Sequence, residues 1–392
     1  MIKVGTDFSG IGSPEAALKR LNIPHRNIFA CDIDKFAKAS FLELNNPDTF
    51  YDDITTRDFK EVDKLDLYVA GFPCQSFSMA GKRGGFDDVR GTLFFNVAEF
   101  IKINKPECFI LENVKGLLSH DKGRTFQTII DVLSNSGGSV NGQTSFDNID
   151  DGLGYHIYYK VLNTKHYGIP QNRERIFIIG FKYWRSFNFP KKMLLNLKLK
   201  DILEKDVDEK YFLSNKKIEF LKEYSRSNPF TDRNTKDIAN CITAGYYKGP
   251  GDGEYIIHSL FPRSSKTGKG GTGHLSKTDG TTYCLDTGNN QAIEWIADYR
   301  NDEGLRIRKD NNSPCLTASK NSETEISRMP PIIKQNKIRR LTPLECWRLQ
   351  GFTDDEFYKG KKVNSDTQLY KQAGNSITVN VMVEILKKIY LK

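Results

Sequence analysis

Several features common in other protein classes are missing from this sequence of 392 residues. It has no apolar run long enough to span a bilayer, and its N-terminus runs directly into an expected strand, so we expect neither a membrane anchor nor a signal peptide. Its seven cysteines form no CxxC pair and no Cys/His cluster with metal-ligand spacing, which predicts that no metal is bound. An odd number of cysteines in a long chain without a secretory signal favours free thiols, and hence a cytoplasmic protein.

Acidic residues are too few to balance the basic ones. The formal net charge is +9, and such an excess fits a polyanionic partner, because lysines and arginines near phosphates release counterions. A basic protein without a nucleic-acid partner would have the same balance. The charge therefore agrees with double-stranded DNA as a partner without establishing it.

The first half of the chain alternates short apolar strands with amphipathic helices, which is the pattern of a parallel α/β sheet. We expect strands at 2–6, 27–31, 67–70 and 108–111, and helices at 14–21, 34–44, 92–104 and 124–134. The polar segment 134–153 is expected to be a surface loop, and 375–391 a final helix that returns to the first domain. After about residue 185 lysine-rich and glycine-rich stretches replace this alternation, which indicates a second domain.

One cysteine stands where an enzyme would place a nucleophile. Cys74 follows Gly71, Phe72 and Pro73 just after the apolar run 65–70, at the expected C-terminal end of a strand. Open α/β folds carry their chemistry at that edge of the sheet, and a thiolate there can act as a nucleophile. Most cysteines are nevertheless small buried hydrophobic residues, so this stretch alone leaves both interpretations open.

Further sequence blocks accompany this cysteine in a characteristic order. They are 8–12 (FSGIG), 73–75 (PCQ), 112–114 (ENV), 171–175 (QNRER) and 374–376 (GNS), with 339–352 (RRLTPLECWRLQGF) before the last. In this order the blocks closely resemble those of the cytosine-C5 DNA methyltransferases. The resemblance covers roughly residues 1–185 and 337–392, and six blocks in the right order leave little room for coincidence.

The resemblance implies a Rossmann-like, S-adenosylmethionine-dependent methyltransferase domain with a mostly parallel sheet, at residues 1–190 and 370–392. It also implies a smaller, irregular β-rich target-recognition domain at 191–352, with a hinge at 353–369. The expected activity is that of a prokaryotic DNA (cytosine-5-)-methyltransferase that acts on a flipped-out cytosine in a short specific duplex sequence. We expect a monomer that associates with the nucleoid through DNA, belongs to a restriction–modification system, and acts independently of a cognate endonuclease.

The resemblance assigns the central chemistry to a cysteine and a glutamate. Cys74 would add as a thiolate to carbon 6 of cytosine, which makes carbon 5 nucleophilic toward a methyl group. Glu112 would donate a proton or a hydrogen bond to N3, and its apolar neighbours Ile110, Leu111 and Val114 predict a buried carboxyl with a raised pKa. The alternative for Glu112 is a strand-end carboxylate that caps the next turn.

Two arginines complete the expected catalytic set. We expect Arg173 and Arg175 to point to opposite faces of their strand, so that only one reaches the pocket directly. The resemblance places Arg175 toward the cytosine O2 and Cys74, and Arg173 in support of the site or in contact with backbone. A salt bridge between Arg173 and Glu174, or another carboxylate, is the other interpretation.

The methyl donor implied by the resemblance is S-adenosylmethionine. The turn at 8–12 lacks the full GxGxxG pattern, which argues against a nicotinamide enzyme, and its glycines would let the backbone approach the methionine moiety. Asp32, shorter than the glutamate common in the family, is expected to bind the ribose, Ile33 to pack on the adenine and Asp53 to bind the adenine amino group. The full set of expected cofactor-binding residues is Phe8, Ser9, Gly10, Ile11, Gly12, Asp32, Ile33, Asp53, Ile54, Pro73, Asn375 and Ser376.

DNA contacts are expected on two sets of loops. A base inside a duplex must be flipped out to be reached, and the loop 76–90, with its glycines, cations and hydroxyls, is predicted to close on DNA as a lid. A disordered surface loop is the other interpretation. Base readers are expected within 246–253, 263–274 and 309–321. The expected DNA-binding residues are Ser78, Lys82, Arg83, Arg90, Tyr246, Lys248, Arg263 and Lys269.

Three segments of the second region resemble one another around Cys241, Cys284 and Cys315. Each follows an aspartate and precedes a segment rich in Gly, Asn, Lys or Ser. One interpretation is a repeated strand-and-turn unit whose loops face DNA. The other is chance similarity between short strands.

Two other functions stay open at this point. An RNA cytosine-C5 methyltransferase would use the same blocks, although the variable region 190–335 is typical of a DNA-reading domain. A non-catalytic DNA-binding protein could have kept the scaffold, although Cys74, Glu112 and Arg175 are all present. Covalent capture by DNA that contains 5-fluorocytosine separates the enzyme from a pure binder.

Overall fold

The computed structural model describes two parts of the chain in detail. They are residues 1–73, 93–134, 138–141, 143–144, 152–212 and 214, and residues 336–391. Between these parts it describes only short strands, at 239–240, 254–259, 295–300 and 304–307. The three similar segments around Cys241, Cys284 and Cys315 lie outside the described residues.

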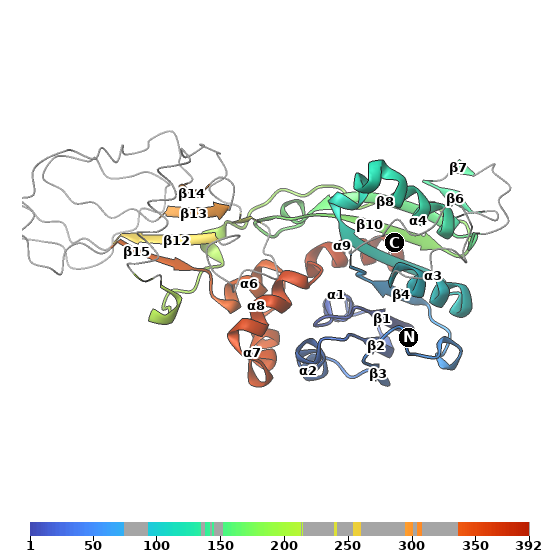
Figure 1. Ribbon diagram of the computed structural model, residues 1–392, viewed down its shortest axis with the longest axis horizontal. Coiled ribbons are helices and arrows are strands. Elements are labelled where there is room, and N and C mark those ends of the chain that lie inside the picture. Colours follow the sequence, from blue (N-terminus) through green and yellow to red (C-terminus); the bar gives the residue numbers. More distant parts are fainter. Residues whose placement is uncertain are drawn as a thin grey trace, which may run out of the picture.

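A nine-stranded sheet forms the body of the molecule (Figure 1). In spatial order its strands are β3 (Thr49–Tyr51), β2 (His25–Cys31), β1 (Ile2–Asp7), β4 (Leu67–Ala70), β5 (Cys108–Val114), β10 (Glu174–Phe181), β8 (His156–Asn163), β6 (Ser139–Val140) and β7 (Gln143–Thr144). The first five run parallel, whereas β10 is antiparallel to both β5 and β8. The sheet confirms the expected mostly parallel α/β fold.

The chain reverses its direction of travel across the sheet next to β1. From β1 it proceeds to β2 and β3 on one side, and then to β4 and β5 on the other. Loops that leave neighbouring strands at such a point diverge and open a crevice at the carboxyl ends of the strands, where open α/β folds bind ligands. The topology therefore predicts a site beyond the ends of β1 and β4.

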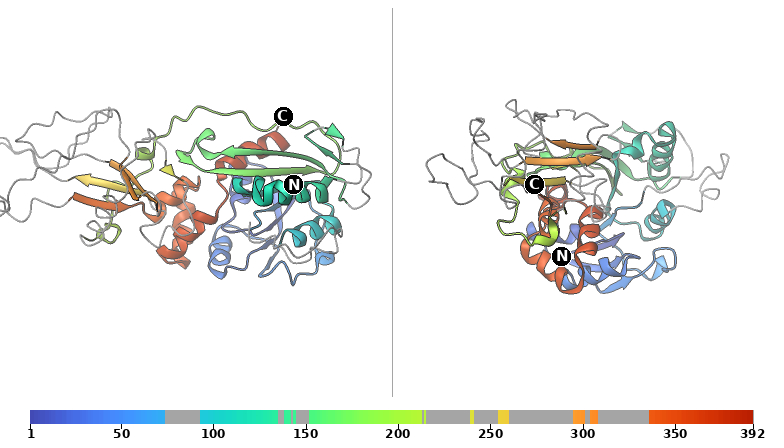
Figure 2. Two further views of the ribbon diagram at one scale, coloured as in Figure 1. Left: turned by 45° about the horizontal axis from the view of Figure 1, so that its top comes forward. Right: turned by 60° about the vertical axis from the view of Figure 1, so that its left-hand side comes forward.

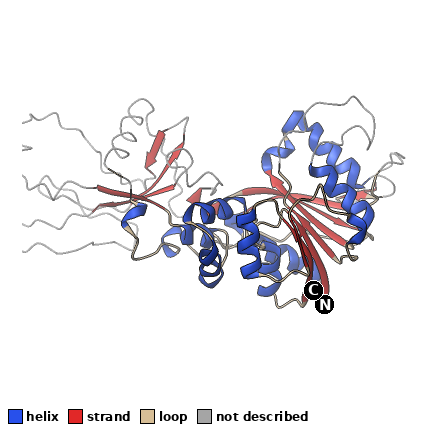
Figure 3. Ribbon diagram, turned by 60° about the horizontal axis from the view of Figure 1, so that its bottom comes forward, coloured by secondary structure: helices blue, strands red, loops and turns tan. Residues whose placement is uncertain are grey.

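Helices cover both faces of this sheet (Figure 3). The side chains of β4 alternate between the faces: Leu67 and Val69 join one core with α1 (Ser13–Arg20) and α9 (Val379–Tyr390), while Tyr68 and Ala70 join the other with α3 (Leu93–Asn104) and α4 (Arg124–Ser134). Alternate side chains of a strand point to opposite faces of the sheet. Because helices cover both faces here, both sides of β4 are buried, and the strand has no polar face.

Most expected elements of the first half agree with the structure to within three residues, but two expectations were wrong. Residues 134–153 were expected to be a surface loop, yet Ser139 and Val140 form β6, which pairs with the start of β8. The expected helix 375–391 is broken: α8 (Asp366–Asn375) ends where it was expected to begin, and α9 starts at Val379. Ser376 is extended, and its hydroxyl donates to the Gln372 carbonyl at 2.7 Å, so a polar side chain competes with the helical bonds.

A separate antiparallel sheet lies beyond α6 (Pro343–Leu349), away from the nine-stranded sheet (Figure 1 and the left view of Figure 2). Its strands are β14 (Gly304–Ile307), β13 (Trp295–Arg300), β12 (Glu254–Ser259) and β15 (Asn336–Arg340). A two-residue strand, β11 (Ala239–Asn240), pairs with β9 (Gln171–Asn172). The expected hinge 353–369 contains α7 (Asp354–Val363), which packs against α2 (Lys35–Leu44) of the first part. The division into domains stays a prediction.

Two further observations concern the described part of the chain alone. None of its helices combines the length and the apolar character that a membrane crossing requires. Within the same residues, no three His, Cys, Asp or Glu side chains come together in a way that could hold a metal ion.

Candidate active site

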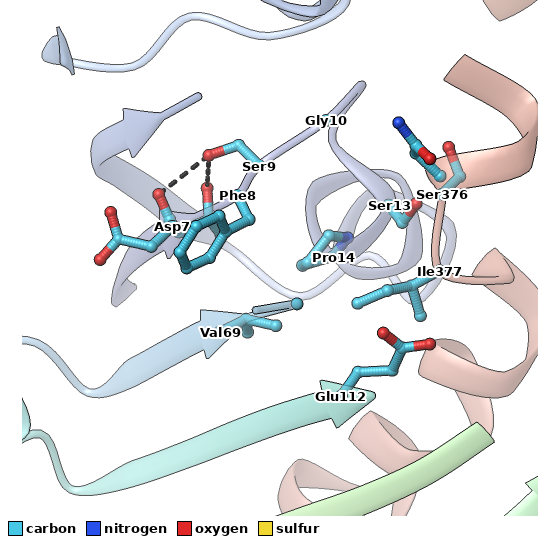
Figure 4. Close-up of a pocket in the computed structure, with 13 residues that line it drawn as sticks. Asp7, Phe8, Ser9, Gly10, Ser13, Pro14, Val69, Glu112, Ser376 and Ile377 are labelled. Atoms are coloured by element: carbon cyan, nitrogen blue, oxygen red, sulfur yellow. Dashed lines mark hydrogen bonds between the residues drawn. The ribbon is translucent and has the colours of Figure 1, made fainter. Parts of the chain in front are cut away.

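A pocket opens where the topology predicts one, at the carboxyl ends of β1, β4 and β5 (Figure 4). The start of α1 and the link between α8 and α9 close it from the other side. Three of the six sequence blocks, 8–12, 112–114 and 374–376, thus meet in one place, although the first and the last are more than 360 residues apart. The lining residues are Thr6, Asp7, Phe8, Ser9, Gly10, Ser13, Pro14, Val69, Gly71, Glu112, Asn375, Ser376 and Ile377.

The turn after β1 is held in a tight, left-handed conformation. Phe8, Gly10 and Gly12 have φ angles of 54°, 56° and 86°. The Ser9 hydroxyl accepts a hydrogen bond from the Cys31 amide at 2.8 Å and donates to the Thr6 carbonyl at 2.9 Å, which ties the turn to β2. A Cβ atom on Gly10 would meet nothing within 4 Å, so its backbone faces open space. A ligand can therefore approach this backbone closely.

The expected turn residues divide into two groups. Phe8, Ser9 and Gly10 line the pocket, whereas Ile11 is only 1% exposed and packs in the core. Gly12 caps α1, and a Cβ there would lie 2.3 Å from the Asn45 amide nitrogen. Ile11 and Gly12 thus shape the turn and do not line the pocket.

The second group of expected cofactor residues lies at the ends of β2 and β3, outside the pocket lining. The Asp32 carboxylate accepts from the amides of Gly10, at 2.8 Å, and Asp34, at 2.9 Å, and burial raises the pKa of Asp32. Ile33 is 80% exposed. Asp53 accepts from the amide and the hydroxyl of Thr55, both at 2.8 Å. Each Asp32 oxygen keeps a second lone pair for another donor, whereas Oδ1 of Asp53 accepts both bonds from Thr55, so a further donor to Asp53 would use Oδ2.

Ile54 and Pro73 complete this group. Ile54 is 4% exposed and packs in the core beneath the link to β4, while Pro73 is exposed at the end of that strand. The Asn113 amide donates to the Phe72 carbonyl at 2.9 Å, which fixes the chain just before Pro73 to β5. The ENV block therefore anchors the residue that directly precedes the PCQ block.

Arg57 was not expected from the sequence. Its guanidinium donates to both carboxylate oxygens of Asp7, at 2.9 and 2.7 Å, and both side chains are completely buried. The Tyr68 hydroxyl donates to the same carboxylate at 2.6 Å, and the guanidinium lies 4.1 Å from the ring centroid of Phe29. The only sequence signal was an aspartate at the end of an apolar strand, which must find a partner when it is buried. Arg57 ties the chain that follows Ile54 to β1.

Glu112 lies on the floor of the pocket with its carboxyl toward Ile377 (Figure 4). It is 8% exposed, and its Oε1 lies 3.1 Å from Nε of Arg175. Burial raises the pKa of Glu112, and the positive charges of Arg175 and Arg173 oppose that rise. The raised pKa confirms the expectation from the apolar neighbours. The capping alternative was wrong, because β5 continues to Val114 and the next turn has no side-chain cap.

The two arginines do not point away from each other, so the expectation of opposite faces was wrong. Side chains two residues apart in an extended chain share a face, and both guanidinium charges act on Glu112. Arg173 is buried and donates to the carbonyls of Gly374, at 3.1 Å, and Ser376, at 2.9 Å. Glu174 forms an ion pair with Lys115 at 2.9 Å, so the structure favours backbone contact for Arg173 over the salt bridge with Glu174.

Nine expected site residues lie outside the described residues, and their roles stay predictions. They are the nucleophile Cys74 and the DNA-binding residues Ser78, Lys82, Arg83, Arg90, Tyr246, Lys248, Arg263 and Lys269. The first described stretch ends at Pro73, directly before the expected nucleophile, at the carboxyl end of β4. The strand end therefore lies beside Glu112, since β4 and β5 are paired neighbours.

Comparisons with known proteins identify the family. A family model described as C-5 cytosine-specific DNA methylase matches residues 3–391. The orphan methyltransferase M.SPRI of Bacillus phage SPR is 33% identical, with 99% of this chain and 97% of the relative covered. The type II methyltransferase M.HpaII of Haemophilus parainfluenzae is 34% identical, with 98% and 88% covered.

Solved structures support the fold. The Dnmt2 methyltransferase of S. pombe has a TM-score of 0.59 at 18% identity, with 99% of this chain and 97% of that chain covered. The methyltransferase EhMeth of Entamoeba histolytica has a TM-score of 0.59 at 16% identity, with 100% and 98% covered. Because the family model spans almost the whole chain and relatives exceed 30% identity over nearly their full length, the protein belongs to the C-5 cytosine-specific DNA methylases and is a DNA (cytosine-5-)-methyltransferase.

Proposed function

We propose that the enzyme transfers a methyl group from S-adenosylmethionine to carbon 5 of a cytosine flipped out of a short specific sequence in double-stranded DNA, through a covalent bond between Cys74 and carbon 6. One observation carries this proposal. A buried carboxyl with a raised pKa, Glu112, shares a pocket with the glycine turn and lies beside the strand end that leads into Cys74.

The pocket fits the methyl donor. Its turn offers open backbone at Gly10, and Asp32 and Asp53 keep acceptor lone pairs for hydroxyl or amino groups beside it. The exposed Ile33 side chain offers an apolar surface for a planar ring. Asn375 and Ser376 line the opposite wall. When bound, S-adenosylmethionine supplies an electrophilic methyl group.

The protein side chains would prepare the cytosine for that transfer. The Cys74 thiolate forms a C–S bond at carbon 6, and the displaced electron pair moves toward N3, where Glu112 delivers its proton. Carbon 5 is then electron-rich and takes the methyl group. Loss of the carbon 5 proton to a base restores the ring double bond, the C–S bond breaks, and the N3 proton returns to Glu112.

The arginines would keep this acid in place. Arg175 lies close enough to Glu112 to orient its carboxyl, and its charge stabilises the carboxylate that remains after proton transfer. Arg173 holds two carbonyls of the link between α8 and α9, and thereby the wall that carries Asn375 and Ser376. We assign Arg173 to positioning and Arg175 to the reacting groups.

The proposal extends to the division into domains and to the biological role of the enzyme. Residues 1–190 and 370–392 would form the catalytic domain, 353–369 its hinge, and 191–352 a target-recognition domain that reads the DNA sequence. One relative is a type II methyltransferase and another an orphan methyltransferase. We propose a monomeric modification enzyme that works independently of a cognate endonuclease.

Bisulfite sequencing of host DNA tests this proposal, after expression in a strain without cytosine methylases. Conversion-resistant cytosines within one short motif are expected for the wild-type enzyme and absent for Cys74→Ser. Trapping on duplex DNA that contains 5-fluorocytosine then gives a covalent complex only when Cys74 is present. Full conversion in both samples, from folded protein, would overturn the proposal and direct the test to RNA substrates.

A further inference from the structure

A second hollow lies at the same edge of the sheet, between the end of β8 and the segment that follows β10. Five basic side chains line it: Lys160, Lys165, His166, Lys191 and Lys192. We call this hollow the lysine groove. Lys160, Lys191 and Lys192 are exposed, and Lys165 is half-buried. Phe189 and Pro190 form an apolar floor next to them.

The cations of the lysine groove are not neutralised by the chain itself. Among the described residues, none of its four lysines forms an ion pair. Glu174 is the only acidic residue in the described lining, and Lys115 already pairs with it at 2.9 Å. Burial lowers the pKa of His166, and the charges of Lys192 and Lys165 lower it further, so the two lysines face the same space.

Like charges held together repel each other, and a folded protein gains nothing from such an arrangement unless an anion occupies it. Other exposed lysines of the described chain do pair with carboxylates, such as Lys115 with Glu174 and Lys210 with Asp366. The lysine groove therefore has the electrostatic character of a binding surface for a polyanion.

The strand register places the lysine groove close to the active site. Glu112 is on β5, Arg175 and Glu174 are on β10, and Glu174 pairs with Asn163 at the end of β8. Neighbouring strands are about 4.8 Å apart, so β8 lies roughly 10 Å from β5. A duplex rises about 3.4 Å per base pair along each strand, so this distance corresponds to roughly three base pairs.

We propose that the lysine groove binds the phosphate backbone of the substrate duplex a few base pairs from the flipped cytosine. This inference rests on the proposed function, since the distance to Glu112 matters only if the base is held there. The groove offers lysine point charges and no arginine, and its Asn163 amide already donates to Asn172, so it would position the duplex without reading its sequence.

The test is the salt dependence of DNA binding, measured by fluorescence anisotropy with a labelled mixed-sequence duplex of about 30 base pairs in about 50 to 200 mM KCl. The variant is Lys165→Gln with Lys192→Gln. Each lost phosphate contact reduces the slope of log Kd against log salt by about 0.9, so we expect a reduction of about 1.8. Lys165→Arg with Lys192→Arg should restore the slope, because the charges return.

The matched control removes the same charge from the opposite edge of the sheet. Lys60 and Lys64 are exposed and precede β4, so Lys60→Gln with Lys64→Gln should leave the slope unchanged. Equal slopes for the groove variant and the wild type, with both proteins folded, would overturn the inference. So would an equal reduction in the control.

The outcome is independent of the methylation test. A reduced slope together with full bisulfite conversion would leave the lysine groove as a DNA-binding surface and reject the proposed chemistry. An unchanged slope together with motif-specific methylation would reject DNA binding by the lysine groove and support the proposed methyl transfer.

Discussion

Two charged clusters lie along the same edge of the sheet, and they differ in burial and in ion pairing. At β1 the Arg57–Asp7 pair is completely buried, doubly hydrogen-bonded and packed against Phe29. At β8 the lysines of the groove are exposed or half-buried, and no carboxylate of the described chain pairs with them. A buried charge requires a partner within the chain, because removing it from water is costly. An exposed charge stays hydrated without a partner and remains available to bind a ligand.

Glu112 stands between these extremes. It is almost as buried as Asp7, yet its partner Arg175 lies at a more exposed position and contacts it through a single close approach of 3.1 Å. The carboxyl is thus paired loosely enough to keep a raised pKa. The proton transfer proposed for Glu112 requires such an intermediate state.

The largest expected effect is on catalysis. Glu112→Gln keeps the size of the side chain and removes the transferable proton, so we expect the rate of methyl transfer to fall about 10²- to 10⁴-fold. The check is radiolabelled methyl incorporation into DNA, with the unfolding free energy measured beside it. Glu107→Gln, on an exposed carboxylate before β5, should keep full activity. A similar loss in both variants would contradict the role of Glu112.

The pH profile sharpens this prediction. The raised pKa keeps Glu112 protonated to higher pH than an ordinary carboxyl, and the active acid is lost as the pH rises through that pKa. The residual activity of Glu112→Gln should lack this alkaline decline. An identical decline in both enzymes would assign it to another group.

Breaking the buried pair should cost stability. Arg57→Met leaves the Asp7 carboxylate buried without its cation, and we expect the free energy of unfolding to fall by about 3–5 kcal/mol. Urea denaturation measures this loss. Lys60→Met, on a nearby exposed site, should change it by less than about 0.5 kcal/mol. Recovery of stability in Asp7→Asn with Arg57→Met would confirm that the unpaired charge is the cause.

Glu15 tests the effect of burying a carboxyl that forms no ion pair within the described chain. Its side chain is completely buried in the first turn of α1, and burial raises its pKa to about 7 from 4.5. A raised folded-state pKa means that the stabilising protonated form is fully present below about 4.5 and is lost as the pH rises through about 7. We expect the free energy of unfolding to fall over this range by on the order of 3 kcal/mol.

The matching variant is Glu15→Gln, which cannot ionise and can keep the hydrogen bond from Thr6. Its unfolding free energy should be flatter with pH and higher than that of the wild type at about pH 8. The comparison uses urea denaturation at several pH values. Parallel pH curves for the two proteins would show that Glu15 is not the titrating group.

The smallest effect on stability is expected from breaking the exposed ion pair between Lys115 and Glu174. Lys115→Gln breaks the ion pair with Glu174, but both side chains are about half exposed, so the loss of stability should be under about 1 kcal/mol. DNA binding should still weaken at low salt, because Glu174 would then place a free negative charge in the lysine groove. Weaker binding without a stability change would separate the exposed cluster from the buried one. Unchanged binding would argue against the groove.

Local pattern predicted the first half of the fold well. The alternation of apolar strands and helices gave the strand ends at Ala70 and Cys31 and the helix 124–134. The secondary structure of two short segments was predicted wrongly, because it depends on distant partners. Ser139 and Val140 form a strand by pairing with β8. The break after Asn375 depends partly on Arg173, which binds the carbonyls on either side of it.

The candidate site shows the same division. Short motifs identified Glu112, Arg175 and the turn at 8–12, since these residue types at strand ends point to chemistry by themselves. Arg57 and the lysine groove carried no motif. These residues are recognised only by which charges are buried together and which are left exposed, and no linear sequence pattern contains that information.

The sequence alone determined the class of sheet, the family and the residues proposed to carry the reaction, because periodicity and motif order are local properties of the chain. Only the tertiary structure decided which of those residues meet in the pocket, which hold its walls, and which charges stay unpaired. Packing joins segments more than 300 residues apart, as when Asn375 comes to line a pocket with Phe8. Contacts of that kind depend on the whole core and on the burial of each charge, and these are settled only when the chain has folded.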